Sequence, residues 1–133
     1  MTHVLVFPFR RGATIVLAGV AICALAAWAA PFHLHLVKSM PAANATVAAA
    51  PDSIRLWFSQ PPELKVTSVK VTGPGTAAVA LAPLAKRDSS LVIAPVKDKM
   101  AAGAYTVAWR TMAKDGHVAR GMFAFRIGAA SAP

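Results

Sequence analysis

Cysteine is nearly absent from this sequence, since Cys23 is the only one among 133 residues. A lone cysteine forms no disulfide within its chain, so the fold depends on its hydrophobic core. Cys23 also lies in an apolar run that export would remove. The remaining domain then has no thiolate, the ligand that is typical of structural zinc sites.

Catalytic motifs are missing as well. The chain has no Gly-x-Ser-x-Gly elbow and no glycine-rich loop that could hold a phosphate group. Asp115, which lies in a polar turn two residues before His117, has no second carboxylate paired with it by a motif, as general acid–base catalysis would need. Hydrolytic catalysis therefore lacks support, and we predict that the protein is not an enzyme.

Acidic residues are scarce: five stand against 14 lysines and arginines, which gives a formal net charge of +9. Without Arg10 and Arg11, which precede the apolar run, the remainder carries +7. This charge would permit contact with nucleic acid or a membrane surface. The basic residues are dispersed singly, however, and no basic run contains interleaved aromatic residues. We therefore expect a solvated basic surface that keeps the domain soluble, and no nucleic-acid partner.

The N-terminal third of the chain resembles a secretory signal peptide. Arg10 and Arg11 precede residues 12–30, a run of 19 residues without a charge. Alanines at positions 27 and 29 fit a cleavage pattern of small residues. A run of this length could also span a bilayer, so an uncleaved apolar anchor remains an alternative. We predict that residues 1–32 form a signal helix and that the protein is exported to the periplasm.

Seven short strands are predicted after the signal segment. The clearest pair forms a hairpin in which apolar and small or polar residues alternate, with Tyr105, Val107 and Trp109 in one strand and Phe123, Phe125 and Ile127 in the other. Five further segments have strand patterns or are bounded by turn residues: 33–37, 53–59, 66–72, 77–81 and 89–94. With no amphipathic helix after the signal segment, the pattern predicts an all-β fold, a seven-stranded Greek-key antiparallel β-sandwich of the Ig-like or cupredoxin-like kind.

Tyr105 follows Gly103 and Ala104 at the entry of the first hairpin strand. This position resembles a tyrosine corner, in which the ring is packed and the hydroxyl group bonds to backbone upstream.

The domain after residue 32 has three histidines: His33, His35 and His117. His117 lies in the hairpin loop, two residues after Asp115. Imidazole nitrogens, a carboxylate and a free α-amine are ligands that Cu(II) prefers. Taken alone, Asp-x-His in a loop is more often a solvated turn, and His33 and His35 fit an ordinary strand surface. The residues by themselves leave both interpretations open.

A series of short blocks follows the chain from residue 33 to residue 127. They are Leu-Val-Lys-Ser-Met-Pro-Ala at 36–42, Ile-Arg-Leu-Trp-Phe-Ser at 54–59, Ala-Trp-Arg at 108–110, Asp-Gly-His at 115–117, Gly121 and Phe-Ala-Phe at 123–125. In this order they resemble the CopC family of periplasmic copper-binding proteins, which act in copper resistance and uptake.

The resemblance implies a seven-stranded Greek-key sandwich over residues 33–133. It also implies one Cu(II) ion bound through an amino-terminal histidine and the Asp-x-His loop. Carried over by position, the metal ligands are His33, Asp115 and His117.

Three departures from the family pattern bear on the site. Cleavage directly before His33 would leave Phe32 where a small residue is normally required, so the α-amine ligand is in question. Gln60 stands where the family often has an acidic residue, and Glu63 is not aligned with that position. The loop at residues 73–77 contains no methionine, so we predict no dedicated Cu(I) site. The roles of His35, Gln60 and Met112 stay open.

The sequence is compatible with three functions. The sequence favours a periplasmic Cu(II)-binding protein that acts in copper resistance or homeostasis, or delivers copper to a membrane importer. The alternative is an exported structural or interaction β-sandwich with weak or no metal binding. Oxidative chemistry at a copper centre is the third, and only the metal-binding residues themselves support it.

Overall fold

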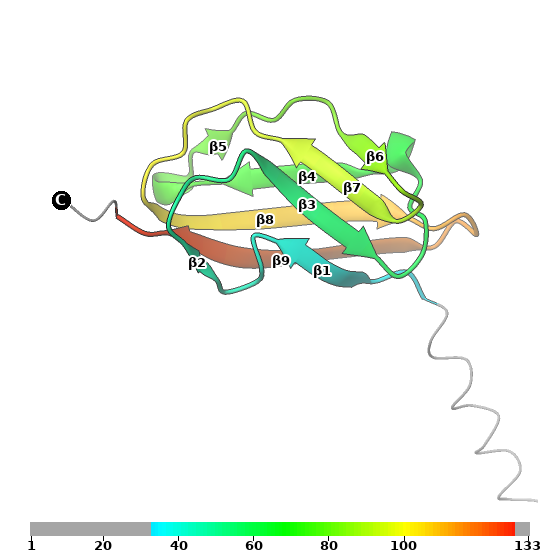
Figure 1. Ribbon diagram of the computed structural model, residues 1–133. Helices are drawn as coiled ribbons and strands as arrows, with labels where there is room; N and C mark the ends of the chain where they lie inside the picture. The colour runs from blue at the N-terminus through cyan, green and yellow to red at the C-terminus, as the bar shows by residue number, and fades with distance from the viewer. Residues whose placement is uncertain (1–32, 130–133) are drawn as a thin grey trace, which may run out of the picture. The chain divides into compact units, whose positions relative to one another are not determined.

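The computed structural model describes residues 33–129, which form nine strands in two sheets (Figure 1). One sheet has the strand order β1-β3-β7-β6 and the other β2-β9-β8-β4-β5. The strands are β1 (Leu36–Met40), β2 (Thr46–Val47), β3 (Ser53–Phe58), β4 (Ser68–Thr72), β5 (Ala78–Val79), β6 (Ala85–Arg87), β7 (Leu91–Pro95), β8 (Gly103–Met112) and β9 (Val118–Ile127). The described residues also contain two single-turn 3-10 helices, η2 (Leu64–Val66) and η3 (Pro74–Thr76).

The predicted all-β sandwich is confirmed, with two additions. β2 and β6 are short strands that the sequence did not indicate, and β2 pairs with β9 in parallel. The predicted signal helix falls in residues 1–32, outside the described residues. Within residues 33–129, no helical segment has the length and apolarity needed to cross a lipid bilayer.

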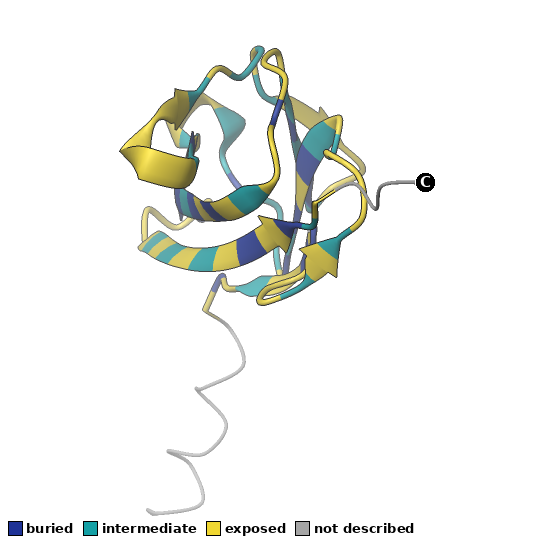
Figure 2. Ribbon diagram, turned by 90° about the vertical axis from the view of Figure 1, so that its left-hand side faces the viewer, coloured by how far each residue is buried: buried dark blue, intermediate teal, exposed yellow. Residues whose placement is uncertain are grey.

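The core lies between the inner faces of the two sheets. Along β3, Ile54, Leu56 and Phe58 are buried and alternate with more exposed residues, as the period of two predicted. Figure 2 shows this alternation as bands of buried and exposed residues along the strands. Burial of one such apolar side chain contributes about 1.5–3 kcal/mol. The rows of buried residues therefore fix which face of each strand points outward.

Aromatic side chains join the two sheets. Phe58 of β3 and Trp109 of β8 meet edge to face, with ring centroids 5.2 Å apart. Beside Trp109, Gly121 is its direct cross-strand partner, and a Cβ atom at Gly121 would lie 2.7 Å from the indole Cζ2. The absence of a side chain at Gly121 therefore gives the indole its space.

The predicted tyrosine corner is present. Tyr105 is 4% exposed, and its hydroxyl group donates a hydrogen bond of 2.8 Å to the carbonyl oxygen of Ala101, four residues upstream. Its ring stacks on Phe125 at 5.5 Å between centroids. The side chain thus ties the loop before β8 to the hairpin.

We expect the Tyr105→Phe variant to lose about 0.5–1.5 kcal/mol of unfolding free energy, because the ring packing stays and only the hydrogen bond is removed. Urea unfolding followed by tryptophan fluorescence would measure the change. An unchanged midpoint would mean that the hydrogen bond to the Ala101 carbonyl oxygen adds no net stability.

Candidate metal centre

The hairpin β8–β9 positions the Asp-x-His loop. Its two strands pair without interruption from Gly103↔Ile127 to Met112↔Val118, so a ten-pair ladder supports the loop at residues 113–117. The loop is closed by a hydrogen bond of 2.9 Å from the Ala113 N–H to the His117 carbonyl oxygen. Gly116 has a φ of +87°, a region that glycine adopts without steric cost.

Asp115 holds His117 through both of its carboxylate oxygens. One oxygen accepts the backbone N–H of His117 at 3.1 Å, and the other lies 3.0 Å from the ring Nδ1. These contacts lower the pKa of Asp115, mainly through the backbone hydrogen bond and then through the side-chain hydrogen bond. A lowered pKa means that the interaction is present at neutral pH and is lost only as the pH falls through that lowered value.

The contact with Asp115 leaves one ring nitrogen of His117 available to bind a metal. With Nδ1 engaged by a carboxylate, Nε2 is the ring atom left to bind an ion, an arrangement that is common among metal-ligating histidines. Asp115 can itself become a ligand only by releasing one of these contacts. Both side chains are largely exposed, at 74% for His117 and 63% for Asp115, so they have room to rotate.

The third predicted ligand, His33, lies beside the same loop. Its ring is edge-on to that of His117, with the centroids 6.1 Å apart. A metal at about 2.0 Å from a ring nitrogen lies roughly 3 Å from the ring centroid, so this separation is within reach of one shared ion. In Figure 1 the start of the described chain, in cyan, runs close to the orange hairpin loop.

These side chains do not form a preorganised metal-binding site. Within residues 33–129, no group of three or more histidine, cysteine, aspartate or glutamate side chains is arranged to hold a metal ion. Asp115 points to His117 rather than toward a common centre, and His33 is exposed. Metal binding at this position would therefore require the exposed side chains to turn.

Ser59 holds the histidine segment in place, a role that no local sequence pattern predicts. The backbone N–H of His35 donates to Ser59 Oγ at 3.0 Å, and that hydroxyl group lies 3.3 Å from the His33 carbonyl oxygen. The Ser59 N–H in turn donates to the His35 carbonyl oxygen at 2.9 Å. Pairing of β1 with β3 begins at Leu36, later than the predicted start at residue 33, and its register shifts between Leu36 and Lys38.

His35, Met112 and Gln60, whose roles the sequence left open, occupy three different places in the fold. The His35 Nδ1 lies 2.9 Å from the His33 carbonyl oxygen, which can only accept, so this nitrogen carries the hydrogen. Met112 is the last residue of β8 and half-buried, and its carbonyl oxygen accepts the Glu63 N–H at 2.9 Å. Gln60 is half-buried directly after Ser59. The segment from Gln60 to Glu63 therefore runs past the base of the loop.

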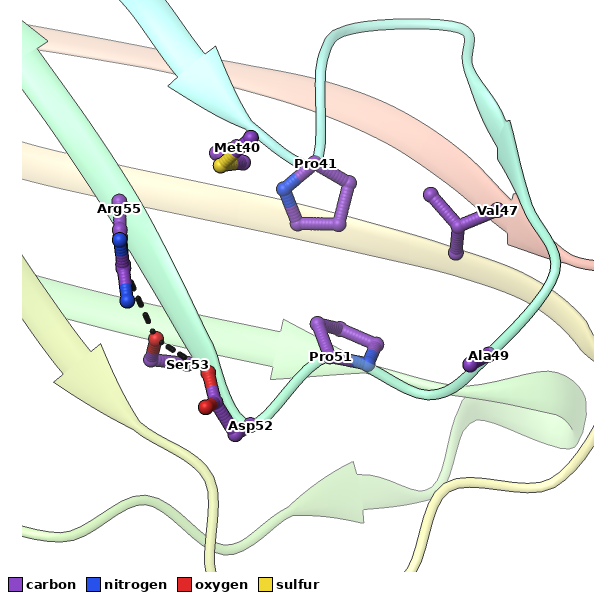
Figure 3. A pocket seen from close by; sticks show the side chains of 8 residues that line it. All are labelled: Met40, Pro41, Val47, Ala49, Pro51, Asp52, Ser53 and Arg55. Atoms are coloured by element: carbon purple, nitrogen blue, oxygen red, sulfur yellow. Dashed lines mark hydrogen bonds between the residues drawn. The ribbon is translucent and has the colours of Figure 1, made fainter.

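A hollow of about 290 Å³ lies at the Met40 end of β1, the end away from His33 (Figure 3). Its polar groups bond to one another: Ser53 Oγ donates to Asp52 at 2.8 Å and accepts from Arg55 Nε at 3.4 Å. Met40 and Pro41 contribute apolar surface. Because it contains one carboxylate and no histidine, this hollow is not the candidate metal site.

Comparison with known proteins identifies the family of this chain. The model of the CopC domain matches residues 36–128. The chain belongs to the CopC family. It is 40% identical over 98 residues to Protein YobA of Escherichia coli strain K12, covering 71% of this chain and 78% of the relative. It is also 35% identical over 130 residues to copper resistance protein C of Xanthomonas campestris pv. juglandis, covering 91% and 98%.

Solved structures of CopC proteins share the fold. PcoC from Escherichia coli, described as a methionine-rich copper resistance protein, aligns with a TM-score of 0.66 and 31% identity, covering 71% of this chain and 98% of PcoC. CopC from Methylosinus trichosporium OB3b aligns with a TM-score of 0.69 and 23% identity, covering 76% and 99%. The resemblance read from the sequence blocks is therefore confirmed at the level of family and fold.

Proposed function

We propose that this CopC-family chain is a periplasmic Cu(II)-binding protein that acts in copper resistance or homeostasis, and that buffers copper or delivers it to a membrane importer. His33, Asp115 and His117 are the proposed metal-binding residues. The observation that carries the proposal is the 6.1 Å separation of the His33 and His117 rings. The two residues lie far apart in the sequence, one at the start of the domain and one in its last hairpin.

The donor set favours Cu(II) over Cu(I). Imidazole nitrogens and a carboxylate suit the tetragonal geometry of Cu(II), whereas Cu(I) selects thiolates and thioethers. Residues 33–129 contain no cysteine, and Met40 and Met112 lie at the ends of different strands in different sheets. One Cu(II) site and no dedicated Cu(I) site therefore fit these residues.

Export is proposed from the sequence of residues 1–32, whose basic start and apolar run are typical of a signal peptide. The position of the cut would decide whether the α-amine of His33 joins its ring as a ligand. A cut after Ala29 or Ala30 would leave extra residues before His33 and make the ring the only donor there.

Titration of the purified protein with Cu(II), followed by d–d absorption and EPR, tests the proposal. We expect one equivalent to bind at neutral pH, with nitrogen hyperfine coupling from imidazole. Binding should weaken below about pH 6, because protonated imidazole cannot bind a metal.

Two results would decide against the proposal. If no copper binds at neutral pH, the chain is better described as a structural or interaction β-sandwich. If binding does not change between pH 7 and pH 5, the ligands are not histidines. We propose binding rather than turnover, and copper-dependent oxidation of an added reductant would contradict that part.

A further inference from the structure

The outer face of the sheet β4-β8-β9 carries positive charge without a compensating carboxylate. The residues of these three strands include no aspartate or glutamate. Alternation along the strands directs four cationic side chains outward, away from the buried rows: Lys70, Arg110, Arg120 and Arg126. The surface is therefore locally cationic, beyond the general basic character of the chain.

Two of these cations face each other directly. Arg110 and Arg120 are cross-strand partners, and Ser68 is the next residue along the same row. Like charges at directly opposite positions destabilise a sheet. The one ion pair found among residues 33–129 joins His117 to Asp115, so neither arginine is neutralised within the described part of the chain. The fold thus tolerates a repulsion that an anionic partner would relieve.

The cations border a hollow of about 330 Å³ on this face. Ala108 and Gly121, both small, lie along it, and the side chain of Met122 stands at its edge with 74% of its surface exposed. Lys70 and the two arginines form the cationic part of its border, and Ser68 and Trp109 complete the lining. A space with small, apolar residues and a cationic border fits an apolar side chain flanked by carboxylates.

We propose that this surface, made by Ser68, Lys70, Arg110, Arg120 and Met122, docks an acidic segment of a partner protein. A protein segment suits it better than a lipid surface for two reasons. The cations surround a hollow that can receive one side chain. Among the residues of β4, β8 and β9, only Met122 and Val118 are exposed large apolar side chains, at 74% and 44%, and the face has no amphipathic helix to enter a bilayer.

The position of this surface connects it to the candidate metal centre. Two further residue pairs, Thr111↔Ala119 and Met112↔Val118, separate Arg110 and Arg120 from the loop that contains Asp115 and His117. The three residues of strand rise from Arg110 to Ala113, where the loop begins, are roughly 10 Å. If the proposed copper function holds, a docked acidic partner would lie next to the bound ion, which suits a protein that passes copper on.

The test uses a short synthetic peptide in which glutamates flank a leucine, and a control peptide with glutamine in place of glutamate. Binding to copper-free protein is followed by NMR in the presence of a chelator. We expect shifts on the outer face of β4, β8 and β9, with the glutamine peptide inactive and the affinity falling as salt is added.

The R110Q/R120Q variant should bind the peptide at least about fivefold more weakly. The matched control R55Q/R87Q removes the same charge from the outer face of the other sheet, and it should change the affinity less than twofold. Both variants keep the proposed copper ligands, and thermal melting followed by circular dichroism verifies separately that each protein is folded.

Three results would overturn the docking proposal. They are absence of peptide binding by the wild type, equal losses in the two double variants, and R110Q/R120Q-sensitive binding to phosphatidylglycerol vesicles without peptide binding. Since none of these measurements uses copper, the docking surface and the copper site can fail independently.

Discussion

Replacing His117 with alanine is expected to lower the affinity for Cu(II) by more than about 100-fold. Loss of residues that merely orient a metal ligand typically costs 10–100-fold, and removal of a direct ligand should exceed that. His117 is the ring that the β8–β9 ladder and Asp115 hold most firmly. Competition with a chromophoric copper chelator would measure the affinity.

His35→Ala is the matched control, since His35 is an exposed histidine two residues from His33. Its Nδ1 bonds to the His33 carbonyl oxygen, and no described contact joins its ring to the loop. We expect at most a severalfold loss of affinity. If His35→Ala and His117→Ala lost copper equally, the ligand assignment would be wrong.

Asp115→Asn distinguishes two roles for this residue. If the carboxylate only orients His117, an amide can still accept one of its hydrogen bonds, and a loss of about 10–100-fold is expected. If Asp115 binds the ion directly, the EPR parameters should change together with the affinity. An affinity equal to that of the wild type would remove Asp115 from the site.

Trp109→Ala should cause the largest loss of stability, about 3–5 kcal/mol of unfolding free energy. The indole is 8% exposed and packs against Phe58 of the opposite sheet at 5.2 Å, so its removal opens the contact between the sheets. For a domain of about 100 residues, this loss corresponds to a fall in the thermal midpoint of more than about 10 °C. Circular dichroism melts would measure it.

A glycine pair tests the same packing without removing the ring. An alanine Cβ at position 121 would lie 2.7 Å from Trp109 Cζ2, so Gly121→Ala is expected to cost about 1–3 kcal/mol. At Gly128 the nearest atom would be 3.6 Å away, and Gly128→Ala should stay within about 0.5 kcal/mol. Equal stability of the two variants would mean that the indole moves freely.

Periodicity explains which strands were predictable. In β8, Tyr105, Val107 and Trp109 are buried and separated by less buried neighbours, and this period of two is visible in the sequence. In β6 all three residues are exposed, so no apolar alternation marks the strand. β2 has only two residues and depends on pairing with β9, a contact between segments far apart in the chain.

The candidate site was predictable only in part, for a similar reason. The spacing of Asp115 and His117 in a polar turn is a local signal, and the structure shows their direct contact. His33 was associated with them through resemblance to a family, since no local pattern connects residues so far apart. The role of Ser59 depends on hydrogen bonds that reach back 24 and 26 residues. Long-range pairing of this kind leaves no local pattern.

His33 and His117 belong to segments attached to different sheets, one continuing into β1 and the other ending the β8–β9 loop. An ion held by both would act as a reversible cross-link across the sandwich, in a domain whose described residues contain no cysteine. It would close a chain loop from residue 33 to residue 117, and cross-links that close long loops restrict the unfolded chain most strongly. Copper would then be structural support as well as cargo, and its release to a partner would leave the two sheets held by their core alone.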